Sequence, residues 1–480
     1  MNRIGLFLFL LLSTLCRISC MAYDYTLVMD GVYYKVTPDV LNEDKSVKTR
    51  GYAMVVAGEI EYSETVRIVD VVTVHDDVRD EDIEYPVTII ATKCFSNCKK
   101  LKEVILGNNI TTIKSQAFNY SGDSSGNKNA AGNVVRNGVI INLDAPSLEV
   151  VEANAFYSTT VVPPDEVLRI GAKVRQLGDN NTTFLGWSTL CAKKIEIEEG
   201  NTSFELDVVM KDGVVDFEVL YSKNKEKLIY FPRLCTGKNY TTPATTKRVL
   251  THSIYGSALA SFTDGGALVY VGGCTFGCAN ITLGKNVTSI GEYYRLCDGA
   301  NNKMTLTIDP ENKTFKVIED ANHNRALYKI DGNGNPTILL KAFRCNGYKV
   351  NGGQYNENGY FGTETFILPT TVKEIASLAF LNCTYTKFVD CEGNTVLEAK
   401  NISDTAVPSP VSLKFINISL YNVIDGIEYT KDGKKLVTWG TDVNIPNYVM
   451  PDGVTSIAGA GMHSNGNTKT FDISAELKIG

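Results

Sequence analysis

The stretch TFILPTTVKEIASLAF, residues 365–380, decides the fold, because one apolar spacing runs through it. Phe366 and Leu368 alternate, Val372 follows four positions later, and Ile375 follows after three more. A period of two places the first pair on the same side of a short strand, and the Pro-Thr-Thr that follows suits a turn. The stretch therefore predicts a strand, a turn and a return of the chain to the core.

The same spacing returns at several places along the chain. The clearest copies are Val104, Leu106, Ile110 and Ile113; Ile281, Leu283, Val287 and Ile290; and Tyr448, Met450, Val454 and Ile457. Another copy, Ile141, Leu143, Leu148 and Val151, has one extra residue in its turn. Repeats of about 20–50 residues are typical of solenoids, because stacked coils bury the apolar stripe that a single coil leaves exposed. We expect Leu106, Leu283, Leu368 and Met450 to be buried in one row along a parallel sheet.

Three further features accompany the copies. Ala-Phe pairs end several of them (Ala117-Phe118, Ala155-Phe156 and Ala379-Phe380), and we expect each pair to begin a short helical turn, with Phe filling the space between coils. Asn201 and Asn312 stand at the first return point of two copies, where a buried Asn can bond to backbone groups of the turn. Hairpin patterns follow at residues 219–232 and 326–340 and again at 427–437, which turns through Lys-Asp-Gly-Lys.

Together these features resemble the BspA-type leucine-rich repeat family, secreted or cell-surface proteins of Gram-negative gut and oral anaerobes. Cys98 and Cys383, three residues beyond Phe95 and Phe380, add to the resemblance. It extends over residues 23–480. The resemblance implies a secreted or cell-surface binding protein, and it supplies no catalytic residue and no cofactor.

The expected fold is an α+β solenoid, a right-handed leucine-rich repeat superhelix. A parallel β-sheet forms one face, short helical turns and inserted β-hairpins form the other, and a β-rich cap precedes the repeats. The expected boundaries are a signal peptide at residues 1–22, the cap at 23–84, the repeat solenoid at 85–390, and a second repeat segment with a hairpin at 391–480.

The first residues indicate export. Arg3 precedes an apolar run, Ile4–Leu12, that is too short to span a bilayer, and Ala22 suits a cleavage site, so the mature chain is expected to begin at Tyr23. A lipid anchor on Cys16 or Cys20 is the less favoured alternative, because these sites prefer small residues before the Cys. No later apolar run is long enough to span a membrane. The protein is therefore expected to be extracellular or at the cell surface, with the periplasm left open.

Charge and motifs argue against several function classes. A net charge of −7 and no stripe of basic residues argue against nucleic acid as a partner. The four His residues lack the spacing of a zinc protease, and no nucleophile motif or phosphate-binding loop is present.

Residues 331–335 begin like a calcium loop, but Pro336 stands where a Gly is needed, so a hairpin tip is the better interpretation. The acidic run at residues 76–84 is interpreted as a solvated loop, with calcium as the minor alternative. We therefore expect no enzyme, no cofactor and no metal site.

The ten Cys residues after the signal peptide leave three alternatives open. Core packing is preferred, since Cys98 and Cys383 occupy a repeated core position; a few disulfides come next, and a metal site comes last. Polar insertions at residues 121–133 and 351–359 are expected to project as loops.

The leading functional hypothesis is a non-catalytic, adhesin-like protein that binds a host protein, a matrix component or another cell. The alternative is a carbohydrate-binding accessory protein of a glycan-uptake system, in which Trp187 or Trp439 would stack on sugar rings, although both can equally be packing residues. The last repeat, which restarts at Phe471, is incomplete at Gly480, and its open strand edge could pair with another chain.

Overall fold

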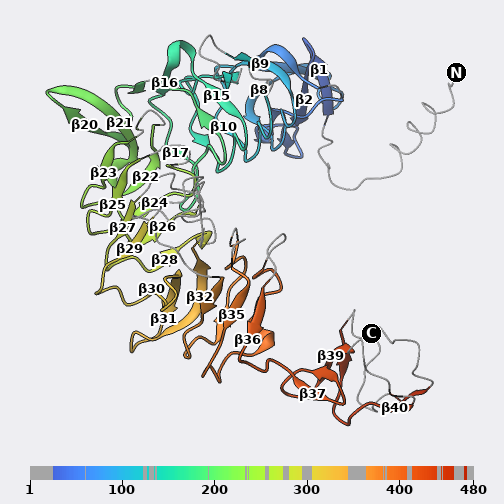
Figure 1. Ribbon diagram of the computed structural model, residues 1–480. Coiled ribbons are helices and arrows are strands. Elements are labelled where there is room, and N and C mark those ends of the chain that lie inside the picture. Colours follow the sequence, from blue (N-terminus) through green and yellow to red (C-terminus); the bar gives the residue numbers. More distant parts are fainter. Residues whose placement is uncertain are drawn as a thin grey trace. The chain divides into compact units, whose positions relative to one another are not determined.

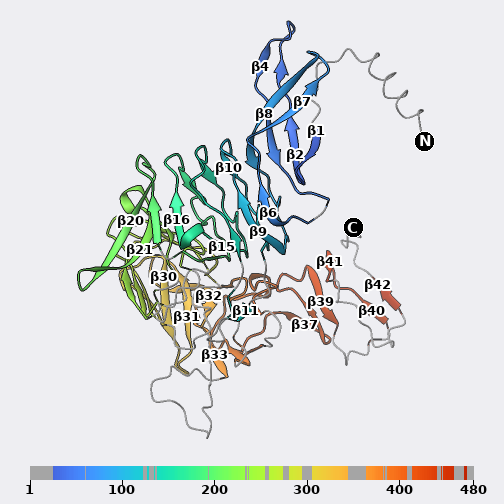
Figure 2. The same ribbon diagram turned by 90° about the horizontal axis from the view of Figure 1, so that it is seen from above.

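The computed structural model describes residues 25–59, 61–122, 127–128, 134–135, 138–192, 194–232, 235, 237–254, 259–273, 280–293, 305–343, 364–381, 383, 386–407, 413–439, 445, 447–458 and 470–472 (Figures 1 and 2). Two compact units divide the chain. Unit 1 contains Met1–Cys235 with Val249–Ser257, and unit 2 contains Thr236–Arg248 with Ala258–Gly480.

Unit 1 begins with antiparallel strands that change to parallel pairing at one strand. β1 (Tyr25–Met29), β2 (Val32–Thr37) and β5 (Tyr52–Val55) pair antiparallel in this order. β5 then pairs parallel with β8 (Glu81–Ile90), which also pairs antiparallel with β7 (Val71–Asp76). Parallel pairing continues from β8 to β10 (Thr112–Ile113), β14 (Val150–Val151) and β17 (Gln176–Leu177). Every second residue of β2 is buried, as expected for a strand with one face on the core.

A second parallel sheet of unit 1 collects the first strand of each coil. Its order is β6 (Ser63–Arg67), β9 (Lys100–Ile105), β13 (Val139–Ile140), β15 (Thr160–Val162) and β18 (Thr189–Leu190). β16 (Val167–Ile170) and β19 (Lys194–Ile197) form a further parallel pair, and β3 (Val40–Leu41) with β4 (Val47–Thr49) and β11 (Asn127–Lys128) with β12 (Val134–Val135) form short antiparallel pairs. The predicted strand-rich repeat with parallel sheets is thus present, because each coil lays one short strand beside the next.

Unit 2 repeats this arrangement. Parallel strands are β23 (Asn239–Thr241), β25 (Ser261–Thr263), β27 (Asn280–Leu283) and β29 (Thr305–Ile308); β26 (Tyr270–Val271) and β28 (Ser289–Ile290); β33 (Thr365–Ile367), β35 (Phe388–Asp390) and β36 (Lys414–Ile416); and β40 (Asn447–Val449) and β42 (Thr470–Asp472). One further strand, β24, spans Arg248–Val249. Leu283, Leu368 and Met450 are buried as expected, but Leu106 is only partly buried. These four residues also lie in or beside strands of separate sheets, so the expected single row is not formed.

The three predicted hairpins are confirmed, and each contains three antiparallel strands. They are β20 (Phe204–Lys211), β21 (Val214–Ser222) and β22 (Lys227–Tyr230); β30 (Phe315–Glu319), β31 (Arg325–Ile330) and β32 (Pro336–Ala342); and β37 (Asn422–Ile424), β38 (Ile427–Tyr429) and β39 (Lys435–Trp439). β32 pairs parallel with β34 (Glu374–Ile375), and β39 pairs parallel with β41 (Ser456–Ile457). Each hairpin is therefore continuous with the repeat.

The expected helical turns at the Ala-Phe pairs are not found. In the part of the chain that the structure describes, helical residues occur only in the 3-10 turns η1 (Pro164–Glu166), η2 (Lys223–Lys225) and η4 (Ala399–Asn401) and at Tyr293, and none of these is an Ala-Phe pair. The residue before the pair has a positive φ at Gln116 (58°), Asn154 (60°) and Leu378 (56°), which no right-handed helix allows. The N–H of Phe118 donates instead to the carbonyl of Ala155 in the next coil (2.9 Å). The predicted right-handed superhelix stays a prediction.

The Phe side chains of these turns stack between coils, as predicted. Phe95 and Phe118 lie 4.9 Å apart between ring centroids and are nearly parallel, and Phe118 and Phe156 repeat this distance. Tyr62 continues the stack at 5.0 Å from Phe95, and Phe184 ends it in an edge contact at 6.2 Å from Phe156. This Phe stack joins five aromatic rings from successive coils of unit 1, so each coil's core depends on its neighbours.

A second column of buried hydroxyl groups runs beside the Phe stack. Ser121 Oγ donates to the carbonyl of Phe95, Thr159 Oγ1 to that of Phe118, and Ser188 Oγ to that of Phe156. In unit 2, Cys383 Sγ faces the carbonyl of Ala342 at 3.4 Å in the same way. Ser121, predicted to begin a projecting loop, is therefore part of the core; the predicted insertion at residues 351–359 lies outside the described residues.

The predicted Asn at the return point bonds to backbone in two successive coils. Asn312 is 4% exposed, and its Nδ2 donates to the carbonyls of Gly284 (3.0 Å) and Val287 (2.9 Å) in the preceding coil. Its Oδ1 accepts from the N–H groups of Thr314 and Phe315, both at 2.8 Å. One side chain thus satisfies four backbone groups that the turns leave unpaired.

Asn201 and a third residue, Asn394, repeat this bonding. Asn201 Nδ2 donates to two carbonyls of the preceding coil at 2.8 and 2.9 Å, although the residue is half-buried and not fully buried as expected. Asn394 is 6% exposed and donates to the carbonyls of Pro369 (3.1 Å) and Val372 (2.8 Å). These three residues form the Asn column of the repeat.

Candidate binding surface

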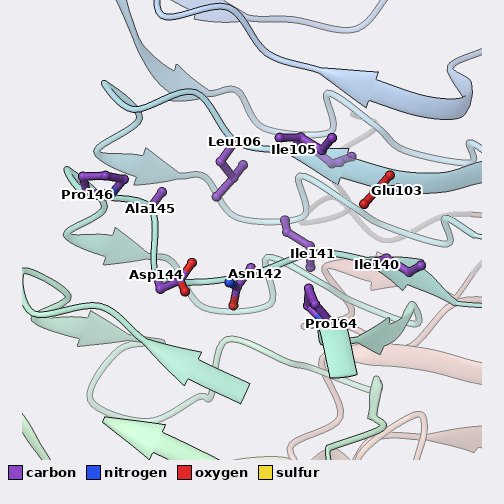
Figure 3. Close-up of a pocket in the computed structure, with 11 residues that line it drawn as sticks. Glu103, Ile105, Leu106, Ile140, Ile141, Asn142, Asp144, Ala145, Pro146 and Pro164 are labelled. Carbon is purple, nitrogen blue, oxygen red and sulfur yellow. The ribbon is translucent and has the colours of Figure 1, made fainter. Parts of the chain in front are cut away.

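The second parallel sheet of unit 1 carries a pocket on its outer side (Figure 3). The pocket has a volume of about 290 Å³ and is lined by the end of β9, by β13 with the loop that follows it, and by η1. Its lining residues are Glu103, Val104, Ile105, Leu106, Ile140, Ile141, Asn142, Asp144, Ala145, Pro146 and Pro164. This volume suits a side chain or a short extended segment better than a drug-sized ligand.

The lining combines apolar side chains with two carboxylates. Ile140 is 36% exposed, and Ile105 and Leu106 are half-buried beside it. Glu103 and Asp144 supply carboxylates, and Thr65 Oγ1 donates to Glu103 Oε2 at 3.1 Å. No Lys, Arg or aromatic side chain lines the pocket. Its chemistry therefore suits an apolar or basic side chain of a partner.

The pocket arises where one copy of the repeat has an extra residue. From Leu143 to Leu148 the spacing is five residues, where other copies have four. The longer turn carries Asp144, Ala145 and Pro146, which Figure 3 shows at one end of the pocket, with Glu103 and Ile140 at the other. Leu143 still bridges Ile170 of the next coil, so the coil keeps its place in the stack. The insertion was visible in the sequence, but the hollow beside it was not predicted.

The two Trp residues proposed for sugar stacking are not fully exposed: Trp439 is buried and Trp187 is half-buried. Trp439 is 4% exposed and contacts Tyr448 edge-on, with ring centroids 4.7 Å apart. Trp187 is half-buried and packs on His252 at 5.1 Å in a tilted arrangement. In this conformation Trp439 offers no ring face to a ligand, and Trp187 offers part of one.

The acidic run at residues 76–84 forms a hairpin more than a loop. β7 ends at Asp76 and β8 begins at Glu81, and His75 lies among three carboxylates: Nδ1 is 2.9 Å from Asp82 and Nε2 is 3.6 Å from Asp80 and 4.0 Å from Asp77. The hydrogen bond with Asp82 and the nearby negative charges raise the pKa of His75. Within the described residues, no group of three or more His, Cys, Asp or Glu side chains is arranged to hold a metal ion.

The Cys residues that the structure describes carry thiols. Five of the six, Cys94, Cys98, Cys235, Cys383 and Cys391, are buried, and Cys191 is exposed. Burial raises the pKa of Cys98 to about 11 and that of Cys391 to about 12, so both are protonated at neutral pH and pack as small apolar groups. For the five buried residues the preferred packing interpretation is confirmed, whereas exposed Cys191 does not fit it. Cys274, Cys278, Cys297 and Cys345 lie outside the described residues.

The residues that would anchor the chain lie outside the described part. The predicted signal peptide and both proposed lipid sites precede Tyr25. The last eight residues, which belong to the repeat predicted to be incomplete, follow Asp472 and also lie outside the described part. In the described segments, no helix combines the length and the apolar character that crossing a bilayer requires.

The comparison with protein-family models agrees with the repeat. The model of the BspA type leucine rich repeat region matches in six copies, at residues 76–129 and 358–428.

No curated protein sequence matches the chain. A leucine-rich repeat protein from Eubacterium ventriosum is 14% identical, with 84% of this chain and 98% of that chain covered and a TM-score of 0.37. The pneumococcal vaccine antigen PcpA is 16% identical, with 82% and 99% covered and a TM-score of 0.32. A leucine-rich repeat protein from Bacteroides ovatus is 14% identical, with 82% and 94% covered and a TM-score of 0.26. The family model and the repeat geometry agree with the predicted resemblance, and the chain is similar to the BspA type leucine rich repeat region over residues 76–129 and 358–428.

Proposed function

We propose that the chain is a non-catalytic, exported protein that binds a protein partner through the outer side of the second parallel sheet of unit 1. The observation that carries this proposal is the pocket beside Ile140, which combines this exposed apolar side chain with the carboxylates of Glu103 and Asp144. A rigid sheet of short parallel strands gives such a pocket a fixed position, and repeat proteins generally use such surfaces to bind other proteins.

The partner is proposed to be a host protein, a matrix component or a surface protein of another cell, which makes the role adhesin-like. Its contact segment should present an apolar or basic side chain to the pocket, because the lining is mostly apolar and carries two carboxylates. The proposed location is extracellular or at the cell surface, with the periplasm left open.

A binding screen with a pocket variant tests the proposal. The chain from Tyr23 would be passed over immobilised collagen, laminin, fibronectin and epithelial cell-surface extracts in biolayer interferometry. Ile140→Arg replaces the exposed apolar side chain of the pocket by a long charged one and should weaken binding at least tenfold, since it removes the apolar contact and burying a charge is costly. Val78→Arg, at a residue that is 50% exposed in the β7–β8 turn, is the matched control and should stay within twofold.

Equal loss in the two variants, or loss in neither, would contradict the pocket as the binding site. A glycan array tests the carbohydrate-binding alternative in parallel. Binding to a defined glycan that Trp187→Ala abolishes and Ile140→Arg leaves unchanged would favour that alternative over the protein-binding role.

A further inference from the structure

The β20–β21 hairpin of unit 1 exposes apolar side chains at its tip. Val208 (44%), Met210 (54%), Val214 (68%) and Val215 (49%) are all exposed. In both views the tip points away from the other ribbons of unit 1 (Figures 1 and 2). The turn itself is a tight Asp-Gly turn, with φ of 51° at Asp212 and 80° at Gly213. Val208, Met210 and Val215 share one face of the hairpin, because Met210 lies opposite Val215, and Val214 lies on the other face. A lone hairpin gains nothing from this exposed apolar group, which indicates a partner.

The two other hairpins show how the repeat normally treats such a tip. The β30–β31 tip is polar, and it bonds to β33: Asn322 and Asn324 donate to the carbonyl of Thr365, and the N–H of Ile367 donates to Asp320. The β37 strand is only three residues long. The β20–β21 hairpin differs from both, because its eight-residue strand β20 extends beyond the core and carries the exposed residues.

β20 also has an open edge. It pairs with β21 on one side, and no strand in the described segments pairs with its other side. The N–H of Lys223 donates to the carbonyl of Ser203, so odd-numbered residues of β20 bond toward β21 and the even-numbered ones point their backbone groups outward. The register shift between Val209 and Met210 places the extra residue in β21, so the open edge of β20 stays regular.

The sequence of β20 is complementary to itself in one antiparallel register. With a two-fold axis at Val208, Leu206 lies opposite Met210 and Val208 opposite its own copy, all on one face. On the other face Glu205 lies opposite Lys211, and symmetry forms this pair of opposite charges twice. The even-numbered residues that meet in this register are the ones whose backbone groups point outward. A register centred on Asp207 would instead place two carboxylates opposite each other.

From this complementarity we infer that β20 pairs antiparallel with β20 of a second copy of this chain, which joins two unit 1 sheets across a two-fold axis. The pairing covers Val208 and Met210 and satisfies the outward backbone groups. Because one strand and a small apolar cluster form the contact, we expect a dissociation constant on the order of micromolar or weaker.

Sedimentation velocity over a concentration series from about 1 to 300 µM tests this inference. The chain from Tyr23 would be measured with a reducing agent, so that an intermolecular disulfide through exposed Cys191 is not mistaken for the strand pair. The wild type should show a reversible monomer–dimer equilibrium. Val208→Lys places two ammonium groups together at the two-fold axis and should weaken the dimer at least tenfold. Val423→Lys, at another exposed Val, in β37 (60%), should leave the dimer unchanged.

A charge exchange tests the register itself. Lys211→Glu should weaken the dimer about tenfold by placing two Glu pairs in register, and the double variant Glu205→Lys/Lys211→Glu should restore it to within about threefold. Thermal unfolding of each variant shows that the fold is kept. A wild type that is monomeric at the highest concentration, a dimer that Val208→Lys does not affect, a dimer that Val423→Lys dissociates, or a double variant that stays as weak as Lys211→Glu would each overturn the inference. A monomer that captures an extended peptide of another protein on β20 would assign the edge to that partner instead.

Discussion

At the scale of single residues, the repeat fills one position in two chemically different ways. Most coils place Val, Ile or Leu at the first return point, for example Val287 and Val372, which are fully buried. Asn201, Asn312 and Asn394 take the same place in three other coils, and each bonds to the carbonyl of the preceding coil's return residue. An apolar residue at this position stabilises the coil by burying its side chain. An Asn there links two neighbouring turns by hydrogen bonds to their backbone groups.

Removing one of these Asn side chains should be costly. Asn312→Ala leaves the carbonyls of Gly284 and Val287 and two N–H groups without their partner, and we expect the free energy of unfolding to fall by about 1–3 kcal/mol. Asn312→Asp keeps the acceptor but places a carboxylate against the two carbonyls, so it should be at least as destabilising at pH 7. Urea unfolding followed by circular dichroism measures both.

Asn286→Ala is the control for this pair. Asn286 is exposed and makes a single bond to the carbonyl of Gly266 (2.8 Å), so its loss should change stability by less than about 0.5 kcal/mol. If Asn312→Ala lowered the free energy of unfolding no more than Asn286→Ala does, the Asn column would reflect only the preference of Asn for turns and would not stabilise the fold.

The sequence revealed part of this column. Asn201 and Asn312 were recognisable because apolar strands precede them and Phe204 and Phe315 follow three residues later. Asn394 has the same spacing to Leu397, but Asp390 stands where the other copies have Ile, and the pattern was missed. The buried hydroxyls of Thr159 and Ser188 gave no signal, since a polar residue after a turn is ordinarily assigned to the surface.

At the scale of elements, a buried carboxylate joins two hairpins before the repeats begin. Asp39 precedes β3, and its side chain is 1% exposed. It accepts from Arg50 (2.9 Å), from the Gly51 N–H (2.6 Å), and from Arg79 (3.0 Å) in the β7–β8 turn. Arg79 also bonds to Asp76 at 2.7 Å. The β3–β4 pair is thus held on β7 and β8 by ionic contacts, because its own short strands bury little apolar surface.

Arg79→Met should loosen this contact. It removes a partner of two carboxylates, and we expect the local free energy of unfolding to fall by about 2–4 kcal/mol. This range lies at the lower end of the range for buried ion pairs, because 11% of the Arg79 side chain is exposed. Native-state hydrogen exchange of peptides that cover residues 39–55 measures the loss. Lys102→Met, which breaks the exposed pair of Lys102 with Glu64 (2.6 Å), is the control and should cost less than about 1 kcal/mol.

The loss should depend on pH with a defined sign. Burial acts to raise the pKa of Asp76, but hydrogen bonds from Arg79 and from two backbone N–H groups outweigh it, so this pKa lies below its ordinary value. The contribution of Asp76 is therefore complete above the ordinary carboxyl pKa and is lost as the pH falls through the lowered one. The difference between wild type and Arg79→Met should shrink from pH 7 to pH 3; a constant or growing difference would contradict the role of the carboxylate.

Elements were predicted well where apolar spacing defines them and poorly where backbone dihedral angles do. The strands and all three hairpins follow from alternation and turn residues. The Ala-Phe segments were expected to be helical, and their composition allows it, but a positive φ at Leu378 or Gln116 cannot be recognised from the residue type. The pocket depends on a one-residue insertion at Asp144, which the sequence shows without indicating which side it opens.

At the scale of the whole molecule, the buried residues form separate clusters along the chain. One extends from Val32 to Leu250 and lies within unit 1. Another, formed in unit 2 by residues that the structure describes, contains Ile427, Tyr429, Leu436, Trp439, Tyr448, Met450 and Val454. In a repeat protein stability is the sum of local terms, so a small cluster near one end should open before the larger one.

The two Trp residues allow this order of opening to be measured. The chain has only two, with Trp187 in unit 1 and Trp439 in the small cluster of unit 2, so Trp187→Phe and Trp439→Phe each leave one fluorescent reporter. During urea unfolding, the Trp439 signal of the Trp187→Phe variant should change at a midpoint about 1 M below that of the Trp187 signal in the other variant, because the seven-residue cluster buries far less apolar surface. Circular dichroism of the wild type should then show both transitions. Coincident midpoints in the two variants would contradict this and show that the chain unfolds as one cooperative body, with stabilising contacts that the separate clusters do not reveal.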